Sequence, residues 1–436
     1  MVRLSIGFFT WLAAARLYPA SQVGMAASAI AAMLLCVEVG VLGIDVALIA
    51  AFPRHRADPR VLLNTAITLA TASAATSALL FLGLAAAGFR ALHFLIVDPA
   101  STAMFLALVI FQAGWWLMDQ AAVALHRSDH VPVRAALAGA TTLTGVIVLG
   151  AIGFDTARSI LIAWMLAALG ACLVGLWQIA RASAGYRFQP TLASPLWRQL
   201  VSVGLPNFAV TAADIAPGLI LPIVAAQQLS SRAAAYWYTV WMMAFAAYSI
   251  PWSFGLHLFA ELADKPAELV RRTRHTLRSG LMIAGGATVG LIVIGPLVLS
   301  LLGHAYAAHG RGPLRLAALA AIPMVAMKAY LYTCRATGRL REGTLAAAGT
   351  GAIAVGAAIA AAPSFGLTGI AGAWLGVQSV GALWAGYRLR RLIDHPDDHR
   401  RAEPQTPEAV ASPSTVQPSV PSAPLTCASV PRAPRT

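Results

Sequence analysis

Long apolar runs, separated by short polar links, occupy the chain from its first residues to about Tyr387. An α-helix needs about 20 such residues to cross a bilayer, and twelve runs approach or exceed that length. The first half holds Leu4–Leu17, Met25–Phe52, Val61–Gly88, Ala100–Leu125, Ala135–Gly153 and Ile160–Ile179. The second half holds Leu200–Leu229, Ala234–Ala260, Leu277–Leu302, Leu314–Cys334, Thr344–Ala362 and Leu367–Tyr387. We therefore predict an all-α polytopic membrane protein with about twelve transmembrane helices, of which the first is either tilted or begins further upstream.

The equal halves predict two six-helix lobes, at residues 1–182 and 200–390, joined by a cytoplasmic linker at 183–199. An Ala-Trp pair at 163–164 recurs at 373–374, and an Ala-Ala pair at 13–14 recurs at 225–226. Such nearly equal offsets are typical of a duplicated transporter with parallel repeats, although alanine is common enough here for chance to produce them. Residues 391–436 are rich in proline and poor in large apolar residues, which predicts a disordered cytoplasmic tail.

Composition and charge support this interpretation. The chain is 58% hydrophobic and only 11% charged, with a mean hydropathy of +0.71, which excludes an ordinary soluble protein. A net charge of +14 suggests nucleic acid as a partner in a soluble chain, but here the basic residues occupy short links between apolar runs. With both termini inside, 24 of the 31 Lys and Arg residues fall in cytoplasmic segments and five in external loops. The positive-inside rule thus predicts cytoplasmic termini, a multi-pass location in the cell membrane, and no nucleic-acid partner.

Sequence signatures of enzymes and metal sites are missing. The chain has no Walker A, GxSxG or HExxH motif, and its four cysteines lie far apart. A membrane polymerase or ligase needs reactive groups on a sizeable external loop, whereas the longest external links have only about a dozen residues. We therefore expect a non-enzyme with no catalytic residue, no metal site and no cofactor beyond a possible coupling H⁺ or Na⁺.

Charged residues inside the apolar runs are candidate pathway residues, because an unpaired charge in hydrocarbon costs a few kcal/mol or more. Glu38 and Asp45 are seven residues apart, which places them on one face of the second predicted helix. Asp214 lies near the middle of the seventh, between Pro206 and Pro217, and these prolines favour bending. All three carboxylates are candidates for lining a substrate or ion pathway.

Three further candidates have competing interpretations. Arg16 ends the first predicted helix and either lines the pathway or extends to the outer interface. Asp119 either lines the pathway, caps the inner end of the fourth helix or pairs with Arg127. Lys328 lies within the tenth helix, where it serves transport or forms a structural ion pair with Asp214.

An aromatic cluster marks the start of the eighth predicted helix, where Tyr236, Trp237, Tyr238 and Trp241 follow one another closely. It fits either an interfacial belt or internal packing.

Four segments resemble a known family. They are residues 14–24 (AARLYPASQVG), 40–49 (GVLGIDVALI), 204–206 (GLP) and 365–373 (FGLTGIAGA). The chain resembles the polysaccharide biosynthesis proteins, the O-antigen and capsule repeat-unit flippases of the multidrug/oligosaccharidyl-lipid/polysaccharide exporter superfamily. The resemblance covers about Leu4 to Tyr387.

The resemblance implies a two-lobed transporter that moves an undecaprenyl-pyrophosphate-linked oligosaccharide across the cytoplasmic membrane by alternating access. The bilayer and other polysaccharide-assembly proteins are its expected partners. Cationic cavity residues commonly meet the pyrophosphate in such proteins; here Arg16 and Lys328, with Arg54, Arg127 and Arg335 near the inner mouth, are available. The carboxylates Glu38, Asp45 and Asp214 outnumber the first two, which departs from the family pattern.

Two alternative transporters stay open. A cation-coupled drug or metabolite antiporter of the same superfamily uses membrane carboxylates, although the first helix carries none. A peptidoglycan-precursor flippase usually has fourteen helices, and twelve fit this chain better.

Overall fold

A computed structural model describes residues 2–55, 58–183, 186–264 and 269–394. Within these ranges the chain forms helices and no strand, which confirms the predicted all-α polytopic fold. From residue 395 onward, the predicted tail at 391–436 lies outside the described residues.

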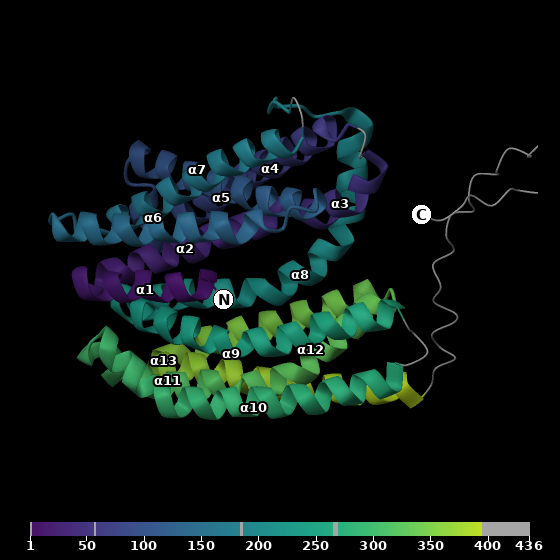
Figure 1. The fold of residues 1–436 in the computed structure, drawn as a ribbon. Helices are drawn as coiled ribbons and strands as arrows, with labels where there is room; N and C mark the ends of the chain where they lie inside the picture. Colours follow the sequence, from purple (N-terminus) through teal and green to yellow (C-terminus); the bar gives the residue numbers. More distant parts are fainter. Residues whose placement is uncertain (1, 56–57, 184–185, 265–268, 395–436) are drawn as a thin grey trace, which may run out of the picture.

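The helices form two bundles joined by one long helix (Figure 1). The N-terminal bundle consists of α1 Val2–Leu17, α2 Ala20–Val41, α3 Ile44–Ala51, α4 Arg60–Gly88, α5 Pro99–Ala124, α6 His130–Ala151 and α7 Ala157–Ala182. Its 3₁₀ turns are η1 Phe52–His55 and η2 Arg90–Leu95. The connecting helix is α8 Ser194–Gln228. The C-terminal bundle consists of α9 Ser231–Asp264, α10 Leu269–Leu302, α11 His304–Leu319, α12 Ala321–Ala336 and α13 Leu340–Asp394.

Helix α13 is two antiparallel helices joined at Gly366, whose φ of 59° and ψ of −143° are not helical. The two halves lie side by side, because Arg388 Nε donates to Glu342 Oε1 at 3.1 Å across the turn. Of the described helical stretches, nine are long and apolar enough to cross a membrane; α2, α11–α12 and α13 each count as one of them. Counting α13 as two helices raises the nine to ten. Adding α1, which is short, and the 34-residue α9 gives the twelve predicted segments.

The second predicted helix, Met25–Phe52, is wrong as a single helix. It breaks between α2 and α3, where Leu42 and Gly43 adopt positive φ values of 53° and 71°. A Cβ atom on Gly43 would lie 2.3 Å from the carbonyl oxygen of Gly204 in α8, so only glycine allows this contact. Glu38 and Asp45 therefore belong to different helices and not to one helical face.

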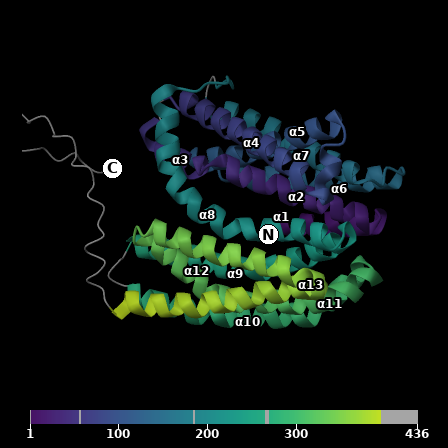
Figure 2. The same cartoon turned by 180° about the vertical axis from the view of Figure 1, so that it is seen from behind.

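Helix α8 connects the bundles (Figure 2). Its start packs against α3 through Gly204, whereas Ala213 and Pro217 pack against Gly351 of α13. The segment before it, within the predicted linker 183–199, is bound to α4: Asn64 Nδ2 donates to the Arg187 carbonyl at 3.3 Å. Helix α8 begins at Ser194, within the predicted linker.

The bundles contact each other at one end of the molecule, which we call the closed end. Arg16 Nε donates to the carbonyl of Leu301 at 2.8 Å, across the bundles. Gln227 Nε2 donates to the Gly88 carbonyl at 3.2 Å. The backbone of Gly24 in α2 lies so close to α9 that a Cβ would sit 1.6 Å from the Ser231 carbonyl oxygen. Two contacts between the bundles, and one from the end of α8 to the N-terminal bundle, thus close this end.

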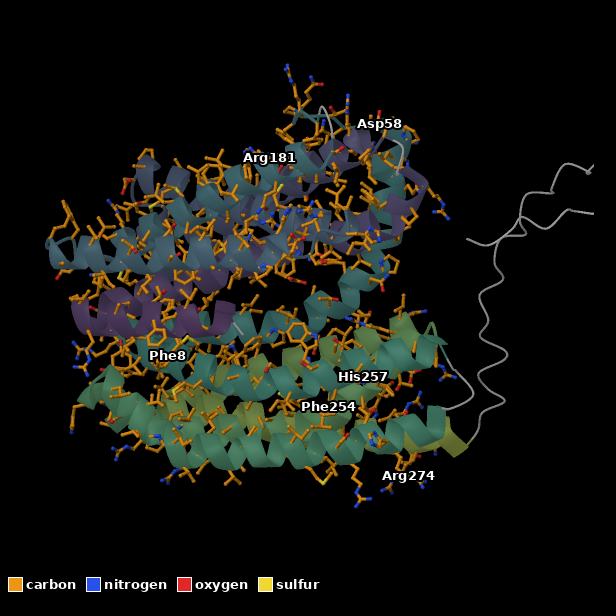
Figure 3. The ribbon with its side chains drawn as sticks, viewed as in Figure 1. Phe8, Asp58, Arg181, Phe254, His257 and Arg274 are labelled. Atoms are coloured by element: carbon orange, nitrogen blue, oxygen red, sulfur yellow. The ribbon has the colours of Figure 1, made fainter. Side chains whose placement is uncertain are left out.

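The fold groups the predicted cytoplasmic and external links at opposite ends. Arg158, which is predicted to be external, follows Ala157, whose amide binds Gln22 near the closed end. Figure 3 shows Asp58 and Arg274, from links predicted to be cytoplasmic, on different bundles but both toward the other end. The fold does not itself determine which end faces the cytoplasm.

Impermeant cysteine labelling is expected to place the closed end outside. In a cysteine-free background, Arg311→Cys should react in intact cells and Arg274→Cys only after permeabilisation, because both side chains are exposed. The opposite pattern would reverse the orientation.

Candidate functional site

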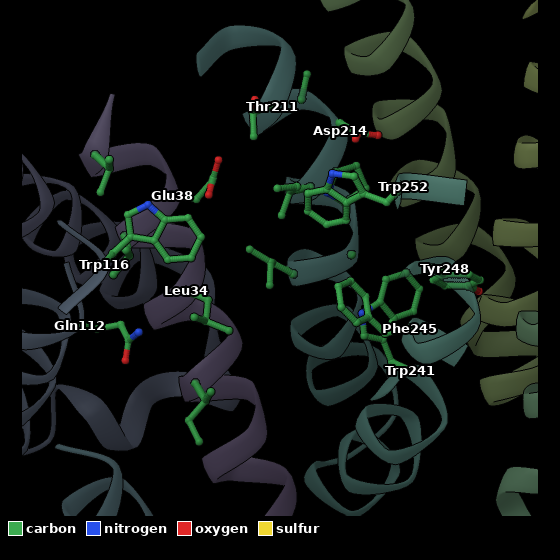
Figure 4. Close-up of a pocket in the computed structure, with 18 of the residues that line it drawn as sticks. Leu34, Glu38, Gln112, Trp116, Thr211, Asp214, Trp241, Phe245, Tyr248 and Trp252 are labelled. Atoms are coloured by element: carbon green, nitrogen blue, oxygen red, sulfur yellow. The ribbon is translucent and has the colours of Figure 1, made fainter. Parts of the chain in front are cut away.

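A cavity of about 520 Å³ lies between the bundles and is lined by both (Figure 4). Its walls come from α1, α2, α3, α5, α6 and α7 on one side and from α9, α12 and α13 on the other, with α8 contributing to the interface. It extends to Val46 of α3, which is 46% exposed and lies away from the closed end. A concave site shared by two packed bodies is a common position for a ligand site.

The N-terminal wall carries the predicted carboxylates Glu38 and Asp45. Trp116 Nε1 in α5 donates to Asp45 Oδ2 at 3.2 Å, which fixes that carboxylate. Gln112 lies one helical turn before Trp116 and lines the same wall. Glu38 and Asp45 therefore both face the cavity, despite the helix break at Gly43.

The C-terminal wall carries the other predicted pair, Asp214 and Lys328. Lys328 Nζ forms an ion pair with Asp214 Oδ2, joining α8 to α12. The Lys328 ammonium also lies 5.5 Å from the ring centroid of Trp252, close enough for a cation–π contact. Asp214 and Lys328 therefore neutralise each other within the wall.

Aromatic rings cover much of the C-terminal wall. Trp241, Tyr248 and Trp374 pack edge to face or tilted, with Trp241 5.1 Å from Trp374 and 5.5 Å from Tyr248 between ring centroids. Phe245 and Trp252 continue this surface along α9 (Figure 4). Of the predicted aromatic cluster, Trp237 is fully buried and Tyr236 nearly so, so internal packing describes these two better than an interfacial belt.

Gln112 Oε1 and Trp374 Nε1 belong to cavity-lining residues and have no hydrogen-bond partner among the described residues. The two residues are 6% and 4% exposed. A buried polar group without a partner costs about 1–3 kcal/mol. Because both atoms lie beneath the cavity surface, a ligand would reach them only after a side-chain movement.

The remaining predicted residues lie outside the cavity lining. Arg16 joins the bundles at the closed end. Arg54 is exposed in η1, and Arg127 is exposed with its Nε 3.3 Å from Asp129 Oδ1. Arg335 Nη2 donates to Thr211 Oγ1 at 2.8 Å, and Thr211 does line the cavity. Arg335 is thus the predicted inner-mouth cation that lies nearest to the lining.

Asp119 is paired with Arg134, so the predicted pair with Arg127 is wrong. Arg134 is completely buried, and its Nη2 lies 2.7 Å from Asp119 Oδ1 and 2.8 Å from the Met118 carbonyl. Gln178 of α7 accepts a third hydrogen bond from Arg134. This network ties α5, α6 and α7 together inside the N-terminal bundle. Arg134 lies just before the predicted run Ala135–Gly153, whereas α6 already begins at His130. Asp129 and Pro132 are the sequence signals for that earlier helix start.

Metal-binding geometry is missing from the described part of the chain: no three His, Cys, Asp or Glu side chains there could hold a metal ion. No protein-family model matches the sequence, and no curated protein does.

Solved structures match the fold over most of its length. An inward-facing multidrug resistance MATE family transporter of the MOP superfamily is 12% identical, with a TM-score of 0.69, and the match covers 91% of this chain and 96% of that one. The lipid II flippase MurJ, in an inward closed conformation, is 12% identical with a TM-score of 0.71, covering 89% and 86%. The chain has the fold of MOP superfamily transporters.

A third structure with this fold, a MOP superfamily transporter from Pyrococcus furiosus, is 12% identical with a TM-score of 0.62, covering 91% of this chain and 94% of that one. In that transporter, the reversed polarity of the binding pocket suggests a different function. Identities of this size establish the MOP fold and not a substrate.

Proposed function

We propose that the protein is a flippase that translocates a lipid-linked oligosaccharide across the cytoplasmic membrane, by alternating access, for surface polysaccharide biosynthesis. The observation that carries the proposal is the inter-bundle cavity, whose lining combines aromatic rings with polar side chains such as Asn207, Thr211 and Gln378. The apolar faces of sugar rings stack on aromatic side chains, while their hydroxyl groups donate and accept hydrogen bonds. The cavity offers both kinds of contact.

The contacts between the bundles support the alternating-access part of the proposal. Because Arg16, Gln227 and Gly24 close one end, this arrangement is one of the two that alternating access requires. With the closed end outside, as the basic residues predict, the cavity faces the cytoplasm. The oligosaccharide then occupies the cavity, the lipid tail stays in the bilayer, and Arg335 near the inner mouth is the available contact for the pyrophosphate.

A cation-coupled antiporter is the second candidate function, and a specific observation favours it. The cavity lining holds three carboxylates and one ammonium group among its charged side chains. An excess of negative charge attracts organic cations or a coupling H⁺ or Na⁺.

Reconstituted protein can distinguish these functions. Liposomes should contain undecaprenyl-pyrophosphate linked to a fluorescent oligosaccharide, and a membrane-impermeant quencher should report how much reaches the opposite leaflet. We expect protein-dependent translocation, and a several-fold to about tenfold lower rate in Trp252→Ala, since an aromatic contact contributes about 0.5–1.5 kcal/mol.

Trp177→Ala is the matched control, because Trp177 is 54% exposed on α7 and does not line the cavity. Efflux of an organic cation driven by a Na⁺ or H⁺ gradient, without oligosaccharide translocation, would establish the antiporter instead. Selective translocation of lipid II in the same liposomes would identify a peptidoglycan-precursor flippase.

A further inference from the structure

The N-terminal wall of the cavity carries three hydrogen-bond acceptors from the chain's first helices. Glu38 contributes a carboxylate from α2, Asp45 a carboxylate from α3, and Gln112 an amide oxygen from α5. Gln112 Oε1 is buried with no partner among the described residues, which leaves an unsatisfied acceptor in this wall. Trp116 supplies Asp45 with one donor, which leaves the second carboxylate oxygen available.

Glu38 has charged neighbours but no hydrogen bond to another described residue. Asp45 and Asp214 act on it with the same sign of charge, and Arg335 acts with the opposite sign. Arg335 is itself engaged by Thr211 and lies 5.2 Å from the Tyr332 ring centroid. Among the described residues, the half-buried Glu38 carboxylate therefore faces the cavity without a paired cation (Figure 4).

The charges across the cavity do not cancel. On the C-terminal wall, Asp214 and Lys328 neutralise each other. Glu38 and Asp45 remain on the N-terminal wall, and Arg335 compensates at most one of them. Any ligand in the cavity thus meets a negative wall opposite an aromatic one.

A sugar with a free amino group fits both walls. Its ammonium group provides three donors and a positive charge for the acceptor wall, and its ring provides an apolar face for Trp252 and Phe245. A uronic acid places a third carboxylate beside those of Glu38 and Asp45, and the like charges repel one another in such a site.

Resting on the proposed flippase function, we propose that the cavity selects glycans that carry a free amino group over glycans that carry a carboxylate, and that Glu38 sets this selectivity. The proposal concerns the sugar next to the acceptor wall. The pyrophosphate, which every such substrate carries, does not distinguish among them.

Three synthetic substrates test the proposal in the liposome assay. Undecaprenyl-pyrophosphate is linked to the same disaccharide in an amino, an N-acetylated and a uronic acid form. We expect the amino form to be translocated at least about tenfold faster than the uronic acid form, with the neutral form between them. In Glu38→Gln the amino and uronic acid rates should approach each other, mainly through a slower amino form.

Asp129→Asn is the matched control, since it removes one acidic charge from an exposed site outside the cavity and should leave the ratio unchanged. Should Glu38→Gln accumulate poorly, Asp45→Asn provides the second test, with the same expected loss of selectivity. Equal rates for all three forms, or a faster uronic acid form, would overturn the selectivity while leaving the flippase function intact. Failure to translocate any form would instead overturn the proposed function and the selectivity with it.

Discussion

Asp214→Asn is expected to reduce the amount of folded protein in the membrane and its melting temperature. Lys328 is 6% exposed and its ammonium group pairs with Asp214, whose side chain is 20% exposed. Removing the carboxylate charge leaves a buried cation without its partner, which costs about 3–5 kcal/mol. The Trp252 ring 5.5 Å away retains part of the stabilisation, so we expect a loss near the lower limit.

The double variant separates a structural role of this pair from a role in transport. Asp214→Asn with Lys328→Met removes both charges, and we expect it to recover much of the lost stability, because no charge is then buried without a partner. Thermal unfolding of purified protein and membrane protein level measure this recovery. Asp129→Asn, at an exposed site, should change neither.

Translocation by the double variant gives the second result. Recovered stability with normal translocation would assign the pair to structure alone, whereas recovered stability without translocation would assign it a transport role. Normal protein level, melting temperature and translocation in the single variant would contradict both roles and direct attention to Glu38 and Asp45.

The sequence predicts the helices well because bilayer thickness dictates their length. A run such as Val61–Gly88 has no alternative to a helix in hydrocarbon, where every backbone group needs an internal partner, and α4 follows it within one residue. The break at Leu42–Gly43 is different. It depends on the close approach of Gly204, a residue more than 150 positions away, so apolar pattern alone does not reveal it.

The candidate site likewise has residues that the sequence reveals and residues that only the packing reveals. Glu38, Asp45, Asp214 and Lys328 are identifiable from sequence, because charged residues in apolar runs are rare, and all four line the cavity. The sequence does not reveal the role of Arg134. A basic residue at the edge of an apolar run gives the same pattern whether it faces water or pairs with a buried carboxylate such as Asp119. Trp374 and Gln112 carry no charge and give no such signal; only the packing shows that their polar atoms lack partners.

Gly24→Ala is expected to open the closed end. The added Cβ would lie 1.6 Å from the Ser231 carbonyl oxygen and 2.9 Å from the Ala235 amide nitrogen, both backbone atoms that no side-chain rotation can move. Helices α2 and α9 must therefore separate, which destabilises the arrangement closed at this end relative to the one open there. A shift of about 1.4 kcal/mol already changes the ratio of the two states tenfold.

Labelling of a buried position at the same interface measures this shift. Ser28 is fully buried on α2, one turn beyond Gly24, with Oγ 3.4 Å from the Pro222 carbonyl. In a cysteine-free background, Ser28→Cys should react slowly with an impermeant maleimide, and adding Gly24→Ala should raise the rate about tenfold or more. Gly83→Ala is the matched control, because a Cβ there meets nothing within 4 Å.

Arg16→Ala tests the same interface without a steric clash. It removes the donor to the Leu301 carbonyl, one of the last carbonyls of α10, which have no partner within the helix. We expect a smaller increase in Ser28→Cys labelling, and slower translocation in both variants, because alternating access requires the closed end to form again in each cycle. Unchanged labelling in Gly24→Ala together with normal translocation would show that the bundles do not need this contact. An increase in Gly24→Ala alone would assign the closure to the α2–α9 packing and not to Arg16.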